Sequence, residues 1–335
     1  MQWHDRIGRR LKLKDLHTLQ TVAQLGTMAR AASHLSVTQP AVSKAIADME
    51  RMLQVRLLDR RPQGIELTPY GRSLLKWGTV VFDDLRQAMR EIEFLTDPGS
   101  GEVGIGATGS MIEGFLPGIV GPLAADYPRI KISISLGGSV EGLYRELRER
   151  QIDLILGRIQ KTEPERDLQS EVLFDEPLFV VAGIRNPWIR RRKIELSDLI
   201  GEPWTLPPHG SFAGSLVTDA FMRSGLPVPS RGIFTSSIRM HIALLGSGRM
   251  LAMLPGSVLS LASNRSDIRV LPVKLPVHPP PVGIVRLQNR TLSPVAQIFL
   301  DRARAVAKQL PKHTETTAGR NSMTFKPGKR SKAPP

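Results

Sequence analysis

The segment Thr27–Arg60, TMARAASHLSVTQPAVSKAIADMERMLQVRLLDR, decides the fold of the N-terminal part of this chain. It predicts two short helices joined by a tight turn at residues 35–37. Ala31 and Ala32 give the first helix a small-residue face, which lets a second helix approach closely. Thr38 can cap the second helix, and Pro40 lies in its first turn, where a missing N–H costs nothing.

The second of these helices is amphipathic. Val42, Ile46, Met49 and Leu53 recur at helical spacing and predict one buried face. The opposite face is small, polar and basic, as in a recognition helix that lies in the major groove of DNA, where Gln can pair with adenine and Lys or Arg can reach guanine or phosphate. An ordinary antiparallel helix pair is the alternative. The residues of this segment predicted to contact DNA are Arg30, Thr38, Gln39, Pro40, Ser43, Lys44 and Arg51.

The next segment, RRPQGIELT at residues 60–68, predicts a short β-hairpin with a turn at Pro62–Gly64. Arg60 and Arg61 at its base form a basic wing beside the helix pair. Such a wing suits contact with phosphates or with the minor groove, so both arginines join the predicted DNA-binding set.

Together these segments resemble the winged helix-turn-helix of the LysR-type transcriptional regulators. The match begins near Leu13 and continues to Gly71 almost without a gap. The resemblance implies a homo-oligomer, usually a tetramer, whose C-terminal domain binds a small co-inducer. The first dozen residues are an extension that can touch the DNA backbone or form a solvated arm. The matching positions are Ala31, Ala32, Leu35, Thr38–Ser43, Ile46, Glu50, Leu53, Val55, Leu57, Leu58, Arg60, Leu67, Thr68 and Gly71.

Composition is compatible with a DNA-binding protein. The 335 residues carry a formal net charge of +15, which suits a polyanionic partner. The absence of cysteine excludes disulfides and thiolate metal sites and fits a reducing cytoplasm. No apolar run is long enough to span a bilayer, and the basic N-terminus does not resemble a signal peptide. We therefore expect a cytoplasmic location.

A long helix is predicted to begin at Pro69, because Thr68 can cap it and proline suits its first position. Its apolar residues follow a heptad pattern, which is typical of a dimerisation helix of about 40 Å. A helix packed on its own wing domain is the alternative. The sequence DPGSG at residues 97–101 then forms a hinge. The heptad positions are Gly71, Leu74, Gly78, Val81, Leu85, Ala88, Ile92 and Leu95, with Phe82 and Met89 beside them.

From Glu102 onward, predicted strands and helices alternate, which is typical of open, largely parallel α/β sheets. The pattern forms two units, and the last strand and helix rejoin the first. The chain is therefore α/β overall, and this half resembles the two-lobed, periplasmic-binding-protein-like effector domain of the same family. The predicted domains are a winged helix-turn-helix at 1–68, a linker helix at 69–97, an effector domain at 98–310 and a disordered basic tail at 311–335. Lobe 1 is expected at 98–176 and 280–310, and lobe 2 at 177–279.

Polar residues that follow strands of the effector domain are candidates for ligand contact, because ligands bind at the carboxyl ends of such strands. Hydroxyls suit a carboxylate or another anion, and Arg158 can pair with a carboxylate. For each hydroxyl, an ordinary helix N-cap is the alternative. The predicted effector-binding residues are Thr108, Ser110, Met111, Ser139 and Arg158 in the first lobe, and Ser211 and Ser236 in the second.

Two other functions were weighed against a regulator. Residues 104–109 read GIGATG, a literal dinucleotide-binding GxGxxG, but the following strand lacks the acidic residue that would hold the ribose. A free solute-binding protein fits only the C-terminal half. No hydrolytic motif is present and the seven histidines are scattered, so we expect neither catalysis nor a bound metal or cofactor.

The sequence thus predicts a DNA-binding transcriptional regulator controlled by a small molecule bound between two lobes. The expected partners are double-stranded promoter DNA, a small-molecule effector, plausibly anionic or sugar-derived, and further copies of the chain as a dimer or tetramer. RNA polymerase is an additional candidate. The basic run at residues 188–193 is expected to be a solvated loop, although it could recruit an anion.

Overall fold

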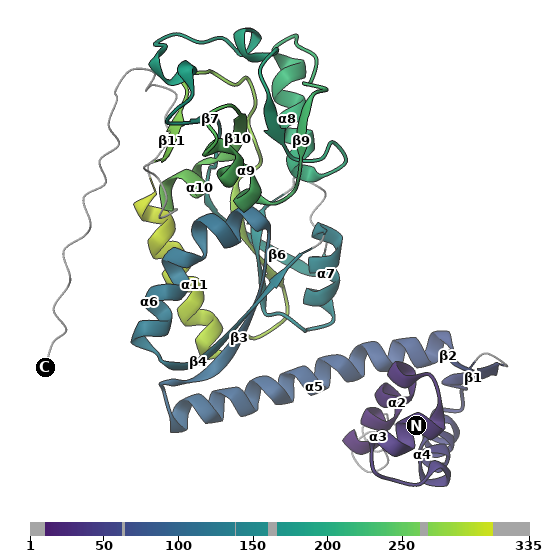
Figure 1. The fold of residues 1–335 in the computed structure, drawn as a ribbon. Coiled ribbons are helices and arrows are strands. Elements are labelled where there is room, and N and C mark those ends of the chain that lie inside the picture. The colour runs from purple at the N-terminus through teal and green to yellow at the C-terminus, as the bar shows by residue number, and fades with distance from the viewer. Residues whose placement is uncertain (1–10, 62–63, 138, 160–165, 262–266, 311–335) are drawn as a thin grey trace, which may run out of the picture. The chain divides into compact units, whose positions relative to one another are not determined.

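The computed structural model describes residues 11–61, 64–137, 139–159, 166–261 and 267–310 (Figure 1). The chain divides into two compact units, Met1–Ile92 and Glu93–Pro335. The predicted tail at 311–335 and most of the N-terminal extension, with Arg6, Arg9 and Arg10, lie outside the described residues.

The first unit is a three-helix core with a hairpin, of which the sequence predicted the second and third helices and the hairpin. Thr27 and Thr38 cap its second and third helices by accepting hydrogen bonds from the backbone amides of Arg30 and Ala41. Leu19, Ile46 and Leu57 lie in the core that these helices share with the hairpin. The elements are α2 (Leu13–Leu25), α3 (Met28–His34), α4 (Gln39–Leu53), β1 (Leu58–Arg61), β2 (Gly64–Leu67), and α5 (Pro69–Thr96), which runs past the boundary of the unit.

Helix α5 does not present its heptad residues uniformly. Gly71 and Gly78 are buried, so its first turns pack on the head. From Val81 onward one stripe of apolar residues is exposed, in which Leu85 and Leu95 keep 45% and 74% of their accessible surface, whereas Phe82 and Phe94 are half-buried. The first turns therefore pack on their own head, as in the alternative interpretation, and the dimerisation role of the exposed apolar stripe stays a prediction.

Lobe 1 of the second unit is built on a five-stranded sheet in the order β4-β3-β5-β12-β6. Strands β4, β3 and β5 are parallel, and β12 runs antiparallel to β5 and β6. Helices α6 and α11 cover one face of the sheet and α7 covers the other (Figure 1). The elements are β3 (Ser100–Ala107), the π-helix η1 (Met111–Phe115), α6 (Pro117–Asp126), β4 (Arg129–Leu136), α7 (Val140–Arg148), β5 (Leu154–Arg158), β6 (Leu168–Phe174), β12 (Val282–Leu287) and α11 (Pro294–Gln309).

Lobe 2 is a second sheet, in the order β11-β7-β10-β8-β9. Helix α8 packs on one face, while α9 and α10 pack on the other. Strand β8, which carries the fully buried Trp204, was not predicted. The elements are β7 (Leu178–Gly183), η2 (Pro187–Arg190), η3 (Leu196–Leu199), β8 (Trp204–Leu206), α8 (Phe212–Arg223), β9 (Gly232–Phe234), α9 (Ile238–Leu245), β10 (Leu251–Pro255), α10 (Gly256–Leu261) and β11 (Ile268–Val270).

The GxGxxG sequence has a packing role. Gly104 and Gly106 lie inside β3, whereas a dinucleotide-binding loop would follow the strand. A Cβ on Gly106 would lie 2.6 Å from the side chain of Ile152, so the glycine lets the chain before β5 approach closely. The Gly104 amide donates to Asp153, whose carboxylate also pairs with buried Arg290 at 2.9 Å. These glycines therefore serve the fold of lobe 1.

Candidate DNA-binding and effector-binding sites

The first turn of α4 presents most of the predicted DNA-contacting residues to solvent. Gln39 and Pro40 begin the helix, and Lys44 lies one turn further along the same exposed face. Arg30 on α3 and Thr38 at the cap are exposed beside them. The buried face carries Val42, Ile46 and Met49, as the spacing predicted.

Two predicted contacts have partners inside the head. The Ser43 hydroxyl lies 3.0 Å from the sulfur of Met28 and is half-buried, so its side chain turns toward the core rather than toward a groove. We correct its assignment accordingly. The exposed Arg51 pairs with Asp48 one turn earlier, at 2.9 Å. Because exposed ion pairs are weak, the guanidinium of Arg51 can leave Asp48 and bind a DNA phosphate instead.

The predicted wing is present as a hairpin. Arg60 lies opposite Ile65 and Arg61 opposite Gly64 in its antiparallel register. The side chains of both arginines, and the turn residues 62–63, lie outside the described part of the chain. Arg56 is an exposed cation immediately before this hairpin that sequence reasoning missed, because it lies on neither the recognition helix nor the wing.

A set of hydrogen bonds joins the recognition helix, the wing and α5. The Glu50 carboxylate on α4 accepts from the backbone amides of Leu57 and Leu58, at 2.7 and 3.3 Å. The Thr68 hydroxyl donates to the carbonyl of Arg56 at 2.6 Å and accepts from the Gly71 amide at 3.0 Å. The orientation of α4 is thereby fixed relative to the start of α5.

In the second unit, the carboxyl ends of the two sheets face each other. Gly114 of η1, which follows β3, lies against the backbone of Ser257, which follows β10. Glu113 of η1 pairs with Arg239 of α9, at 3.3 Å. Loops after strands from both lobes therefore meet at this boundary, where small ligands bind in open α/β sheets.

Thr108 and Ser110 are the candidate hydroxyls least committed to the backbone. They lie 3.4 Å apart at the end of β3 and are half-buried. The Ser110 side chain makes no capping hydrogen bond. A Cβ placed on Gly109 between them would meet nothing within 4 Å, so the loop borders open space.

The other candidate serines have mixed positions. Ser139 and Ser211 cap α7 and α8 by accepting from the amides of Gly142 and Gly214, both at 3.0 Å. The Ser211 hydroxyl also donates to a carbonyl, which occupies its only proton. Ser236 is exposed beside the cap of α9. The capping alternative therefore holds for Ser139 and Ser211.

Two predicted effector contacts need correction. The Met111 side chain is fully buried in the core of lobe 1, where it packs and has no surface to offer a ligand. Arg158 is paired with Glu176 at 2.8 Å, and its side chain is 7% exposed. Burial lowers its pKa from the ordinary value, and the Glu176 carboxylate opposes this change. The charge of Arg158 is therefore paired with Glu176 inside the protein rather than presented to a ligand.

One histidine that the sequence left unassigned supports the lobe 2 loops. His241 is 2% exposed, and its Nδ1 lies 2.7 Å from the hydroxyl of the buried Thr205. Burial lowers its pKa, while a hydrogen bond with the Thr235 backbone raises it. The imidazole joins β8 to the loop that carries Ser236.

Within the described ranges, no group of three or more His, Asp or Glu side chains is placed to hold a metal ion. Among the described helices, none combines the length and the apolar character needed to cross a membrane.

Family models match both halves of the chain. Residues 13–72 match the bacterial regulatory helix-turn-helix protein, lysR family. Residues 96–308 match the LysR substrate binding domain. The chain belongs to the LysR family. This LysR-family protein is therefore a DNA-binding transcriptional regulator with an effector-binding domain, and it is not an enzyme.

Individual relatives agree with this assignment. The regulator GbpR of Azospirillum brasilense is 27% identical over 299 residues, which cover 89% of this chain and 87% of GbpR. Full-length OxyR from Pseudomonas aeruginosa has a TM-score of 0.62 at 22% identity, covering 88% of this chain and 98% of its own. CbnR in complex with its target DNA has a TM-score of 0.57 at 22% identity, covering 88% and 100%.

Proposed function

We propose that this LysR-family regulator reads a two-fold symmetric operator with paired heads and binds a small anionic or hydroxylated metabolite between its two lobes. Binding that favours one lobe arrangement over another would change how the heads are presented to DNA. The metabolite would also decide whether nearby genes are activated or repressed.

The observation that carries the effector site is the pair of hydroxyls at Thr108 and Ser110. They lie where the carboxyl ends of the two sheets meet, and no backbone group accepts from or donates to them in the described residues. Hydroxyls that the fold does not use are available to a ligand oxygen. Ser236, which follows β9 in lobe 2, extends the candidate site, and Ser139, which follows β4 beside β3, keeps its hydroxyl proton available although it caps α7.

A thermal-shift screen of the full chain with carboxylates and sugar-derived metabolites tests this site. A ligand at a hundredfold excess over its Kd should add about 2.7 kcal/mol to the free energy of unfolding. The double variant Thr108→Ala, Ser110→Ala should lose most of that shift, because two hydrogen bonds to the ligand disappear. The matched control is Ser133→Ala, an exposed serine on β4 of the same lobe. A ligand whose shift survives the double variant would show that it binds elsewhere.

The DNA-binding face is tested by separating site preference from affinity. Gln39→Ala should reduce preference for the operator over random DNA by about 1–3 kcal/mol, because a side chain that reads base edges is lost. Lys44→Ala should weaken binding to all sequences and lower the slope of log K against log salt by about one. Fluorescence anisotropy at several salt concentrations measures both effects.

Lys14→Ala is the matched control for this experiment, because Lys14 is exposed on α2, away from the predicted face. It should leave both quantities unchanged. Equal loss of affinity for operator and random DNA in Gln39→Ala would contradict the assignment of α4 as the reading helix.

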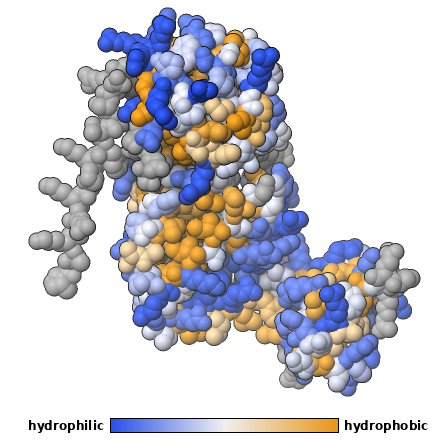
Figure 2. All heavy atoms as spheres, viewed as in Figure 1, coloured by the Kyte–Doolittle hydropathy of each residue, from blue (hydrophilic) through white to orange (hydrophobic). Residues whose placement is uncertain are grey.

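We further propose that effector domains assemble the paired heads into a tetramer. The edge strand β4 exposes Ile134 and Leu136, and the edge strand β9 exposes Ile233 and Phe234. Figure 2 shows apolar side chains gathered on the face of lobe 1 over α6. Such surfaces suit contact between copies of the chain. RNA polymerase is the partner that an activator would contact in addition, and the proposed setting is the cytoplasm, where promoter DNA lies.

A further inference from the structure

A single guanidinium holds both chain segments that connect the lobes. The chain passes from lobe 1 to lobe 2 between β6 and β7, and it returns between β11 and β12. Arg158 Nη1 donates to the carbonyl of Glu176 in the first connection, at 3.0 Å. The same nitrogen donates to the carbonyl of Pro280 in the second, at 2.8 Å. Arg158 itself ends β5, a strand of lobe 1.

The carboxylate of Glu176 extends this contact into lobe 2. One of its oxygens lies 2.8 Å from Arg158 Nη2, and the other accepts from the backbone amide of Ser257, at 3.3 Å. The neighbouring amide of Gly256 donates to the carbonyl of Pro177, at 3.0 Å. The start of α10 is therefore bound to the first connection through both a side chain and the backbone.

The same start of α10 contacts the candidate effector loop through η1. A Cβ on Gly114 would lie 2.8 Å from the backbone of Ser257, so η1 packs directly on α10. Helix η1 begins one residue after Ser110. A shift of this loop on ligand binding would therefore press on α10, and α10 is held by Glu176.

This arrangement leaves the hydroxyl of Ser257 without a hydrogen-bond partner within the described residues, and the residue is 2% exposed. An unpaired buried hydroxyl destabilises the arrangement that contains it. A lobe arrangement that separates η1 from α10 would expose this hydroxyl, so the two arrangements can be close in free energy.

We propose that Arg158 and Glu176 form a buried ionic clamp that fixes the angle between the two lobes, and that the effector acts against this clamp. The second clause rests on the proposed effector site, whereas the first does not. Arginine is suited to the task because its planar guanidinium reaches two carbonyls and a carboxylate at once. A lysine keeps the charge but cannot make all these contacts. Removing either partner leaves the other charge buried and unpaired.

The clamp is tested by measuring the distance between the lobes in the full chain. The absence of cysteine allows two spin labels to be placed at Glu149→Cys in lobe 1 and Arg190→Cys in lobe 2, both at exposed positions. Dilution with unlabelled protein removes distances between copies. The unmodified clamp should give one narrow distance distribution. Glu176→Gln and Arg158→Lys should each shift and broaden it.

Hydrogen exchange gives a second measurement on the same variants without labels. The amide of Ser257 should exchange roughly tenfold to a hundredfold faster in Glu176→Gln, because its acceptor changes from a charged carboxylate to a neutral amide oxygen and loses its ionic contact with Arg158. Glu176→Gln is the milder change, so it serves if Arg158→Lys does not fold.

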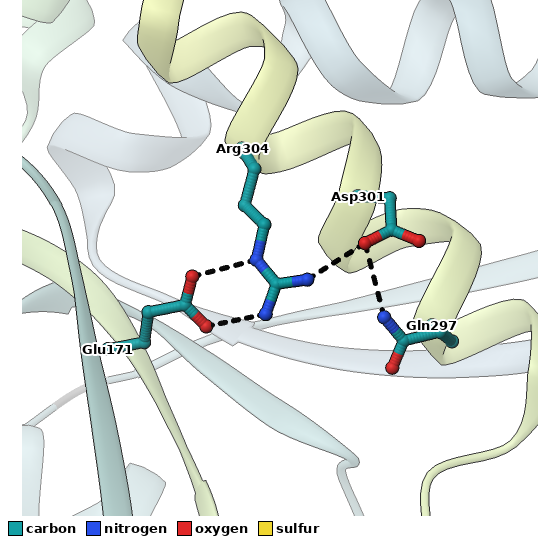
Figure 3. A network of polar contacts seen from close by, with 4 residues as sticks. All are labelled: Glu171, Gln297, Asp301 and Arg304. Carbon is teal, nitrogen blue, oxygen red and sulfur yellow. Dashed lines mark hydrogen bonds and ion pairs between the residues drawn. The ribbon is translucent and has the colours of Figure 1, made fainter.

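The matched control is Glu171→Gln, which removes an ion pair that lies within lobe 1. Glu171 on β6 binds Arg304 on α11 through both oxygens, at 2.7 and 2.8 Å, and Arg304 also binds Asp301 (Figure 3). This variant should leave the inter-lobe distance unchanged even if the melting temperature falls. An unchanged distribution in Glu176→Gln, or equal broadening in Glu171→Gln, would overturn the proposal. Neither measurement needs a ligand, so a failed metabolite screen and a failed clamp are distinguishable.

Discussion

The variant Leu85→Glu should fold, form a smaller assembly than the unmodified chain because its heads no longer pair, and bind its operator about 10²–10⁴-fold more weakly. Leu85 keeps 45% of its accessible surface in the isolated chain, so a carboxylate there is solvated and the fold of the head is unaffected. In a paired helix the same carboxylate would be buried in an apolar seam without a partner, which is costly.

The affinity loss follows from linking two heads. When two heads are joined, binding of the second half-site becomes intramolecular, and this advantage disappears with the dimer. The exposed stripe continues on either side of Leu85, at spacings of three or four residues along α5, through Trp77, Val81, Met89, Ile92 and Leu95. One charge in the middle of such a stripe should therefore suffice.

Sedimentation velocity and operator titration measure the two parts of this prediction. Glu91→Lys is the matched control, because it changes the charge at an already charged and exposed position of the same helix. It should leave both mass and affinity unchanged. If Leu85→Glu assembled like the unmodified chain, the pairing of heads through α5 would be wrong.

The sequence predicted the head well because its determinants are local. Thr27 and Thr38 cap helices through bonds to amides three residues later, and the apolar spacing of α4 sets its buried face. The inward turn of Ser43 could not be predicted in this way. Its partner Met28 lies 15 residues earlier, on another helix, and only the packing of the two helices brings them together.

The alternation of elements predicted two α/β units, but it predicted neither the strand order nor the antiparallel pairs of β12 and β7, and it did not predict the roles of individual side chains. Arg158 was predicted to bind a ligand because it follows a strand. In the structure its side chain instead bonds to the backbone carbonyls of Glu176 and Pro280, which are 18 and 122 residues away in the sequence. Met111 was assigned by adjacency to Ser110, whereas the π-helix turns its side chain into the core. The sequence shows which residues follow a strand. It does not show which side chains from distant parts of the chain will pack against them.

The variant Gly71→Ala should lose DNA binding while the effector domain stays folded. A Cβ on Gly71 would lie 2.1 Å from the carbonyl oxygen of Leu57, which is backbone and cannot move away as a flexible side chain would. That carbonyl already accepts from the Thr68 amide at 2.9 Å. Overpacking at such a contact typically costs about 1–3 kcal/mol.

The loss of DNA binding should exceed the loss of stability, because the contact between Gly71 and Leu57 joins the recognition helix to α5. Glu50 on α4 holds the amide of Leu57, and Thr68 holds the carbonyl of Arg56, so the recognition helix and α5 share one short segment. If α5 must move away from Leu57, then the angle between the recognition helix and the pairing helix changes. Two heads joined through α5 would then present their reading helices at the wrong spacing for one operator.

Circular dichroism melting of the full chain and operator titration check this prediction together, and the metabolite thermal shift reports on the effector domain. The control is Gly78→Ala on the same helix, where the nearest atom to a new Cβ is a Leu16 methyl at 3.8 Å, an ordinary contact. Replacing glycine by alanine inside a helix should there add about 0.5–1 kcal/mol of stability and leave DNA binding intact. Tight operator binding by Gly71→Ala would mean that the Leu57 contact does not set the angle of the heads.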